Sequence, residues 1–325
     1  MITMTDYYKN SGIKRILILG HSGFIGSHLE RFFHKNCPDI ELVGKSLPTL
    51  DLTNEEDVLY LKNFFDISTA IILCAAIKPN FGDNIDNFSQ NVQMIMNVCK
   101  LLEKHPVRRL VYFSSASVYG EDIENTNINE QTPVHPTSYY GMAKFAAERL
   151  LWKTFEKQGQ KQSSQHNQNS QSKQNTKGSL VIIRPPAIYG SGETVPTYNP
   201  TGFVKAALNN EQITLWGDGT EKREFLFIDD IVKIVYELAF NNYSGILNPA
   251  SGKSYSFKQA IDIISKLTNK KLMIASRERT KNKVDNCFNN KLFLKLLPGF
   301  SFTTLEQGIR QVLEEEKLIE GKLRE

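Results

Sequence analysis

The chain has 325 residues, of which 40% are hydrophobic, enough to bury the core of one large domain with a smaller companion. Its formal net charge is only +4, and Lys and Arg alternate with Asp and Glu. A nucleic-acid-binding stripe is therefore not expected.

The cysteines and the apolar runs argue against further classes of protein. The 4 cysteines lie far apart without a Cys-x-x-Cys pair, which argues against a metal site and against a disulfide framework. The first residues contain no apolar signal segment, and no run approaches the ~18 apolar residues of a membrane span. We therefore expect a cytoplasmic protein with no membrane partner.

The first structural signal is a strand followed by a glycine turn and a helix. Lys14 to Leu19 is a short apolar run, typical of a strand buried on both faces of a parallel sheet. Gly20-His-Ser-Gly-Phe-Ile-Gly26 follows at once and leads into a predicted helix at 27–33. This order predicts a dinucleotide site, because glycine lets the backbone approach a pyrophosphate and the helix N-terminus offers free N–H groups. The spacing is G-x-x-G-x-x-G rather than G-x-G-x-x-G.

Strands and helices then alternate through the first half of the chain. Strands are predicted at 40–43, 69–74, 109–113 and 180–184, and helices at 54–65 and 87–104. The fold class is therefore α/β, with a Rossmann-type doubly wound parallel sheet over residues 1–190. Residues 191–325 are expected to form a smaller, interleaved α/β part that mainly binds substrate. A Gln-, Ser- and Asn-rich insertion at about 157–178 is expected to be disordered.

The end of the second predicted strand bears on cofactor choice. Lys45 and Ser46 stand where a carboxylate would bind the ribose 2′-hydroxyl of NAD. A lysine at this place is able to meet a 2′-phosphate instead. The sequence therefore favours NADP over NAD.

Tyr140 and Lys144 form the candidate catalytic pair. They are four residues apart in Thr137-Ser-Tyr-Tyr-Gly-Met-Ala-Lys144, so on a helix they share one face. A nearby cation favours the ionised phenol and makes tyrosine usable as an acid and a base. Taken alone, this spacing is more often a solvated surface pair.

Several further motifs, which follow one another along the chain, favour a catalytic role for Tyr140 and Lys144. They are Gly20-x-x-Gly23-Phe-Ile-Gly26, Asp51-Leu52, Asn91, Ser114-Ser-Ala-Ser-Val-Tyr-Gly120, Tyr140-x-x-x-Lys144, Arg184-Pro-Pro-Ala-Ile-Tyr-Gly190 and Gly217-Asp-Gly-Thr-Glu-Lys-Arg-Glu-Phe225 with Asp229-Asp230. In this order the chain resembles the extended short-chain dehydrogenase/reductase family, the NAD(P)-dependent nucleotide-sugar epimerases, dehydratases and reductases.

The resemblance implies roles for individual residues. Ser115 would hydrogen-bond the reacting oxygen, Tyr140 would be the general acid and base, and Lys144 would hold the nicotinamide ribose. Ser115 and Arg223 would bind the nucleotide sugar, with Arg223 on its diphosphate. NAD(P) would be held by Gly20, Ser22, Gly23, Phe24, Ile25, Gly26, Lys45, Asp51, Leu52, Ala75, Lys78, Tyr140 and Lys144. Relatives often form homodimers through the Tyr140 helix and the long helix before it.

Departures from the family pattern narrow the expected reaction. Ala116 and Ser117 stand where hexose dehydratases carry Asp-Glu, which argues against dehydration. Hydride transfer at the sugar C4 remains, either as 4-epimerisation or as 4-keto reduction in deoxysugar biosynthesis for cell-surface polysaccharides. Ala187 replaces an asparagine that often contacts substrate in epimerases. Two alternatives stay open: reduction of a steroid-like or flavonoid-like ketone, and a non-catalytic NADP-binding sensor.

Overall fold

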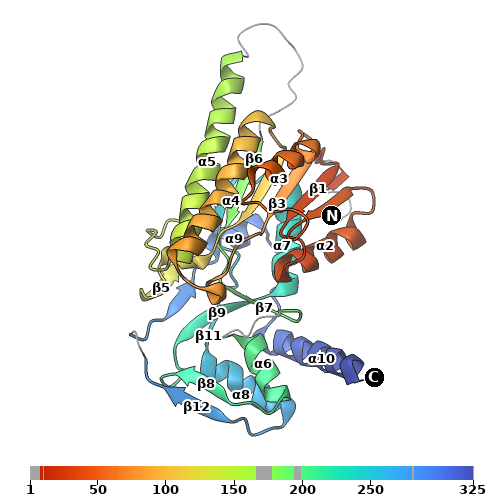
Figure 1. Cartoon of the computed structure of the whole chain (residues 1–325). Helices are drawn as coiled ribbons and strands as arrows, with labels where there is room; N and C mark the ends of the chain where they lie inside the picture. The colour runs from red at the N-terminus through yellow and green to blue at the C-terminus, as the bar shows by residue number, and fades with distance from the viewer. Residues whose placement is uncertain (1–7, 10, 166–177, 194–198, 280–281, 325) are drawn as a thin grey trace. The chain divides into compact units, whose positions relative to one another are not determined.

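The computed structural model describes residues 8–9, 11–165, 178–193, 199–279 and 282–324 (Figure 1). The chain divides into two compact units that exchange segments. The first unit comprises Met1–Val118, His135–Arg184 and Val232–Leu247, and the second comprises Tyr119–Val134, Pro185–Ile231 and Asn248–Glu325. The chain crosses between the units at Pro185, and residues 119–134 and 232–247 are two further exchanged segments.

The first unit is built on one parallel sheet of six strands in the order β10-β6-β4-β3-β1-β2. Leu17 in β1 lies opposite Val43 in β2 and Ile71 in β3. The strands are β1 (Arg15–Leu19), β2 (Glu41–Lys45), β3 (Thr69–Leu73), β4 (Arg109–Phe113), β6 (Ser179–Ile183) and β10 (Gly245–Leu247). The strand order turns outward in both directions from β1 and β3, so the predicted doubly wound sheet is confirmed.

Helices accompany this sheet. They are α2 (Phe24–Asn36), α3 (Glu55–Tyr60), η1 (Leu61–Phe64), η2 (Pro79–Phe81), α4 (Ile85–Lys104), η3 (Ala116–Tyr119), α5 (Tyr139–Gln165) and α7 (Ile228–Phe240), the last of which begins in the second unit. Helices α4 and α5 run side by side (Figure 1). Their apolar residues Val98 and Leu151 join Leu17 and Ile71 in one buried cluster.

The opposite face of the sheet has its own cover. Ile16 and Ile18 alternate with the residues of that cluster and are equally buried. On this side α2 packs against α7, with the rings of Phe33 and Tyr236 at 5.8 Å between centroids. Both faces of the sheet are therefore covered, which explains why its strands read as unbroken apolar runs.

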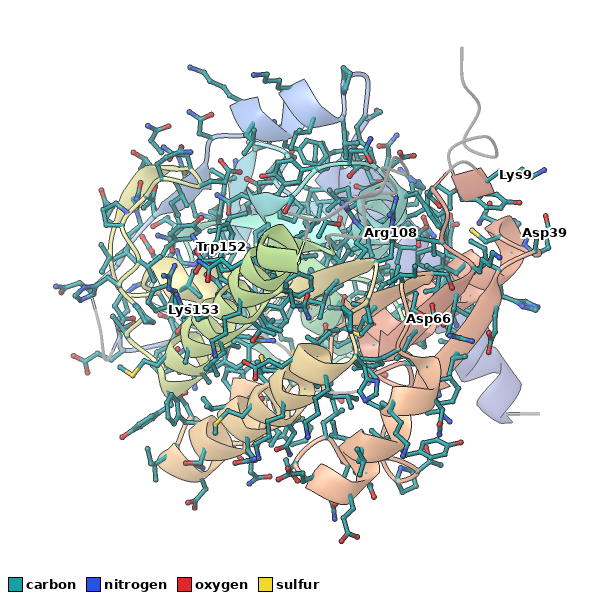
Figure 2. The ribbon with its side chains drawn as sticks, turned by 90° about the horizontal axis from the view of Figure 1, so that it is seen from above. Lys9, Asp39, Asp66, Arg108, Trp152 and Lys153 are labelled. Carbon is teal, nitrogen blue, oxygen red and sulfur yellow. The ribbon has the colours of Figure 1, made fainter. Side chains whose placement is uncertain are left out.

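Helix α5 is longer than predicted. It continues to Gln165, so residues 157–165, expected to start a disordered loop, are helical. Residues 166–177 of that predicted loop lie outside the described residues. On α5, Trp152 and Lys153 (Figure 2) both contact Glu156, through a hydrogen bond of 3.0 Å from the indole and an ion pair of 3.3 Å. Glu156 thus contacts two side chains that lie one helical turn before it.

The second unit contains three small sheets and four helices among its described residues. The sheets pair β11 (Ser254–Ser256) with β9 (Lys222–Phe227) and β7 (Ala187–Tyr189), β12 (Ile274–Arg277) with β8 (Ile213–Trp216), and β13 (Asn286–Phe288) with β5 (Asn125–Ile128). The helices are α6 (Pro200–Leu208), α8 (Phe257–Thr268), α9 (Lys291–Leu296) and α10 (Leu305–Arg324). Across the described parts of both units, no helix has the length and apolarity needed to cross a membrane.

Candidate active site

A cavity of about 300 Å³ opens at the carboxyl ends of β1 and β3, and we call it the glycine-loop cavity. It is lined by Gly20, Ser22, Gly23, Phe24, Ile25, Gly26, Ser46, Leu47, Leu50, Asp51, Leu52, Thr53, Cys74, Ala75, Ala76, Ile77, Lys78, Gln90 and Met94. Ten of the predicted cofactor residues are in this set, and only Lys45, Tyr140 and Lys144 are not.

The turn after β1 requires glycine. Gly20 has a φ of +95°, and a Cβ there would lie 2.7 Å from the main-chain nitrogen of Ala75. Helix α2 begins at Phe24, three residues earlier than predicted, and Gly23 precedes it without a side-chain cap. The first N–H groups of α2 thus border the cavity, an arrangement that suits a pyrophosphate.

Lys45 does not face this cavity. Its ammonium lies 5.5 Å and 5.3 Å from the ring centroids of Tyr60 and Phe64. Successive side chains of a strand point to opposite sides, so Ser46 takes the place beside the glycine loop, with its hydroxyl 2.8 Å from that of Ser22. The expected contact between Lys45 and a 2′-phosphate is therefore not supported, and the preference for NADP loses its basis.

The remaining predicted residues of the cavity are held by local contacts. Asp51 accepts hydrogen bonds from the main chain and hydroxyl of Thr53 at 2.8 and 2.7 Å. Lys78 places its ammonium 5.7 Å from the ring centroid of Phe24, across the cavity lining. Asn91, quoted in the family motif, accepts from the main-chain N–H of Ile77 and donates to its carbonyl, which fixes the segment after β3.

Tyr140 occupies the first turn of α5, where two side chains cap the helix. Asp83 accepts hydrogen bonds from the main-chain N–H groups of Tyr139 (3.3 Å) and Tyr140 (2.9 Å). Ser138 accepts one from the N–H of Gly141 at 3.0 Å. All three leading N–H groups of α5 therefore have acceptors, and the backbone that carries Tyr140 is fixed.

The segment after β4 meets this same turn of α5. A Cβ on Gly141 would lie 2.8 Å from the carbonyl oxygen of Ser117, so only glycine permits the contact. Within the segment, the hydroxyl of Ser115 donates to that of Ser117 at 3.0 Å and accepts from the Ser117 N–H at 3.1 Å. The structure thus brings the loop of Ser115 against the helix turn that begins with Tyr140.

Lys144 lies one helical turn beyond Tyr140 and is 4% exposed. Its ammonium is 5.6 Å from the ring centroid of Tyr140 and donates to the carbonyl oxygen of Phe113 at 2.7 Å. Burial lowers the pKa of Lys144 to about 8, although the nearby acidic groups of Cys74 and Glu148 act in the opposite direction. A cation is thus held beside the phenol ring without an ion-pair partner at hydrogen-bonding distance among its described contacts.

A buried network behind Lys144 was not anticipated. Glu148, one further turn along α5, pairs with Arg184 through contacts of 2.9 Å (Nε to Oε1) and 2.6 Å (Nη2 to Oε2). The hydroxyl of Ser114 also donates to Glu148. Tyr140, Lys144 and Glu148 follow one another at intervals of four residues, so they share one face of α5. This spacing was the sequence signal that could have identified Glu148 as part of the site. The network ties α5 to the ends of β4 and β6.

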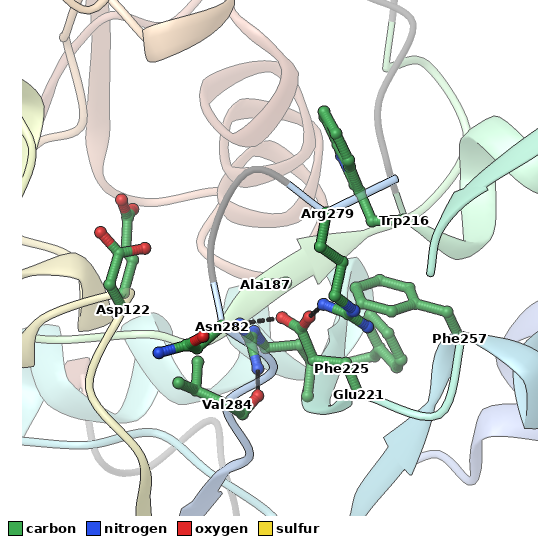
Figure 3. Close-up of a pocket in the computed structure, with 11 residues that line it drawn as sticks. Asp122, Ala187, Trp216, Glu221, Phe225, Phe257, Arg279, Asn282 and Val284 are labelled. Carbon is green, nitrogen blue, oxygen red and sulfur yellow. Dashed lines mark hydrogen bonds and ion pairs between the residues drawn. The ribbon is translucent and has the colours of Figure 1, made fainter. Parts of the chain in front are cut away.

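The second unit holds a separate cavity of about 480 Å³, which we call the arginine cavity (Figure 3). It is lined by Glu121, Asp122, Ala187, Trp216, Glu221, Arg223, Phe225, Phe257, Arg279, Asn282 and Val284. Of the predicted residues, Arg223 lies here, and it pairs with Glu221 rather than with its neighbour Glu224. Arg279 was missed, because it lies 58 positions along the chain from its partner Glu221.

Comparison with known proteins identifies the family of the chain. A profile of the NAD dependent epimerase/dehydratase family matches residues 16–248. The chain belongs to this family. The predicted resemblance is confirmed, and the protein is an enzyme of the NAD-dependent nucleotide-sugar epimerase and dehydratase family.

Individual relatives include both reaction types. A putative UDP-glucose 4-epimerase of Methanocaldococcus jannaschii is 25% identical over 273 residues, covering 77% of this chain and 81% of the relative. The structure of a Thermus thermophilus UDP-glucose 4-epimerase in complex with NAD aligns with a TM-score of 0.76 and 21% identity, over 93% of this chain and 99% of that chain. An NAD-dependent NDP-hexosamine 5,6-dehydratase aligns with a TM-score of 0.71 and 23% identity, over 93% and 97%. The shared fold therefore does not separate epimerisation from dehydration.

Proposed function

We propose that this protein is an NAD-dependent 4-epimerase of a nucleotide-activated sugar, with Tyr140 as its general acid and base. The observation that carries the proposal is the first two turns of α5. They hold Tyr140 beside a buried lysine and against the loop of Ser115. This arrangement suits the exchange of a proton with a sugar hydroxyl.

The glycine-loop cavity fits a dinucleotide. Its turn leaves no room for a side chain at Gly20, and the uncapped start of α2 offers N–H groups to a diphosphate. Asp51, Leu52 and Lys78 would hold the rest of the cofactor. When bound, NAD supplies the hydride acceptor and donor for the sugar carbon.

The chain's own residues would manage the proton. The phenolic oxygen of Tyr140 takes the proton of the C4 hydroxyl as the carbon becomes a ketone, and returns it when the alcohol forms again. The ammonium of Lys144 favours the ionised phenol during this exchange, and the Ser115 hydroxyl hydrogen-bonds the same sugar oxygen. Net epimerisation consumes no cofactor.

Three observations favour NAD over NADP and epimerisation over reduction or dehydration. Lys45 faces Tyr60 and Phe64, which removes the argument for a 2′-phosphate. The Thermus thermophilus neighbour is a 4-epimerase that was solved with NAD. Ala116 and Ser117 supply no carboxylate for the elimination of water after Ser115.

Arg223 and Arg279 would bind the diphosphate of the substrate in the arginine cavity. A diphosphate subsite favours a nucleotide sugar over a steroid-like or flavonoid-like ketone, which offers no such anion. Trp216 and Phe257 add aromatic surface to the same cavity, on which a nucleobase would pack.

The test is to incubate the purified protein with UDP-glucose or UDP-N-acetylglucosamine and to follow the sugar by NMR. The expected result is the C4 epimer, formed without net consumption of cofactor. Consumption of NADH or NADPH with a 4-keto sugar would point to reduction instead. A dehydrated keto sugar as the product would contradict the proposal.

A further inference from the structure

Three acidic residues line the arginine cavity, Glu121, Asp122 and Glu221, and Glu221 is the one that pairs with both arginines. The carboxylate of Glu221 forms ion pairs with both Arg223 and Arg279, one through each oxygen, and Figure 3 shows Glu221 and Arg279 pointing toward one another. The side chains of Glu221, Arg223 and Arg279 are 14%, 23% and 20% exposed. In so sheltered a place, water screens these charges only in part, so each of them affects the binding of an ion strongly.

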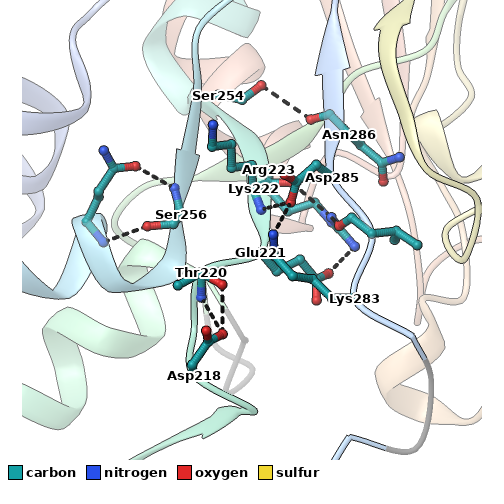
Figure 4. Close-up of polar contacts among 12 residues, drawn as sticks. Asp218, Thr220, Glu221, Lys222, Arg223, Ser254, Ser256, Lys283, Asp285 and Asn286 are labelled. Carbon is teal, nitrogen blue, oxygen red and sulfur yellow. Dashed lines mark hydrogen bonds and ion pairs between the residues drawn. The ribbon is translucent and has the colours of Figure 1, made fainter.

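The main chain holds Arg223 in place independently of Glu221. Its Nη1 donates to the carbonyl oxygens of Lys222 (2.9 Å) and Val284 (2.6 Å), and its Nη2 is directed to the carboxylate of Glu221. The neighbouring backbone is fixed as well, because the N–H of Lys222 donates to Asp285 at 2.9 Å (Figure 4). Removing the charge of Glu221 should therefore leave this guanidinium in position.

Arg279 has an unused donor at the cavity. Its Nη1 is directed to Glu221, whereas its Nη2 is buried and has no hydrogen-bond partner among the described residues. A buried guanidinium nitrogen without an acceptor is costly. An anion with more than two oxygens, such as a diphosphate, would satisfy both this nitrogen and the groups that Glu221 now occupies.

On the basis of the proposed function, we infer that Glu221 is a built-in competitor of the substrate diphosphate for Arg223 and Arg279. The carboxylate offsets one of the two positive charges of Arg223 and Arg279 and repels an incoming diphosphate, so it lowers the affinity of the cavity for that ligand. Glu221 is thus an affinity-determining residue, and the substrate must either displace it or bind beside it.

The experiment uses inorganic pyrophosphate and UDP as probes in isothermal titration calorimetry. Glu221→Gln keeps the shape of the side chain and removes its charge, and we expect it to bind each probe about tenfold more tightly than the wild type. Glu221→Asp keeps the charge, and its affinity should stay close to that of the wild type. Glu278→Gln, which makes the same charge change at an exposed residue outside the cavity lining, is the matched control and should leave affinity unchanged.

The outcomes separate this inference from the proposed function. Tighter binding by Glu221→Gln alone supports the inference. Equal affinities of wild type and Glu221→Gln would overturn the inference and leave the diphosphate subsite intact. Weaker binding by Glu221→Gln would overturn it too, by showing that the carboxylate aligns the arginines for the ligand. Absence of pyrophosphate and UDP binding in all variants that unfold like the wild type would overturn both the inference and the proposed subsite.

Discussion

The main-chain N–H of Tyr140 donates a hydrogen bond of 2.9 Å to the carboxylate of Asp83, a residue of the loop between β3 and α4. The same carboxylate accepts from the N–H of Tyr139. Asp83 is exposed, so its contribution is that of a helix cap and not of a buried charge. Through this cap, the loop before α4 fixes the turn of α5 that carries the proposed acid and base.

Loss of this cap should weaken both the fold and the reaction. We expect Asp83→Ala to lower the free energy of unfolding by about 1 kcal/mol, because two N–H groups lose their acceptor. Turnover should fall as well, because the first turn of α5 becomes less ordered. Urea unfolding and steady-state kinetics measure the two effects. Asp86→Ala, an exposed residue in the first turn of α4, should change both by much less; equal effects would contradict the role of Asp83.

The buried pair of Arg184 and Glu148 predicts a large effect on stability. Arg184→Met leaves the carboxylate buried without its cation and should cost about 3–5 kcal/mol in urea unfolding. Lys153→Met breaks an exposed ion pair with Glu156 and should cost less than about 1 kcal/mol. The double variant Glu148→Leu with Arg184→Met should be more stable than Arg184→Met alone. A double variant that is no more stable than Arg184→Met would contradict the cost assigned to the unpaired carboxylate.

Lys144 predicts a pH dependence of stability above neutrality. Burial lowers the pKa of Lys144 to about 8 in the folded chain from an ordinary value of 10.5. Between pH 8 and pH 10.5 the unfolded chain binds a proton at Lys144 that the folded chain does not bind. The stability that Lys144 contributes therefore rises with pH from about 8 to 10.5 and is lost as the pH falls through 8. The unfolding free energy of the wild type, relative to Lys144→Met, should rise by about 3 kcal/mol over this range. A constant difference would contradict the burial of the charge.

Glu224 predicts the opposite trend at acidic pH. Burial raises the pKa of this carboxyl to about 7, although hydrogen bonds from Ser251 and Gly252 act against the shift. The protonated carboxyl of Glu224 contributes its full stability below pH 4.5, the ordinary pKa of a glutamate. This contribution is lost as the pH rises through 7. Relative to Glu224→Gln, the wild type should therefore lose about 3 kcal/mol between pH 4.5 and 7 in urea unfolding. Parallel curves for the two proteins would disprove this assignment.

Much of the first unit was predictable from the sequence because its signals are local. The apolar runs, the glycine turn and the spacing of Tyr140 and Lys144 each lie within a few residues, and the structure reproduces them. The strand at 109–113 matches β4 residue for residue. The predicted helix at 87–104 begins two residues earlier, at Ile85, because Asn84 caps it.

The features that the sequence did not predict depend on contacts between distant parts of the chain, or on which side of a strand a side chain takes. Strands β5 and β13 are short and lie far apart in the chain, so neither one is visible without the other. Arg279 reaches Glu221 in the same way, from a distant segment. Lys45 was assigned to the cofactor because sequence position alone does not fix which side of a strand end a side chain takes. These pairings and orientations arise only in the folded chain.

The most direct test of the proposed reaction is the turnover of Tyr140→Phe with the nucleotide sugar that the wild type epimerises. The hydroxyl is lost while the ring remains, so NAD should still bind with near wild-type affinity. We predict that turnover falls by at least about 100-fold, because a proton can no longer be exchanged with the sugar oxygen. Wild-type turnover in this variant would contradict the account.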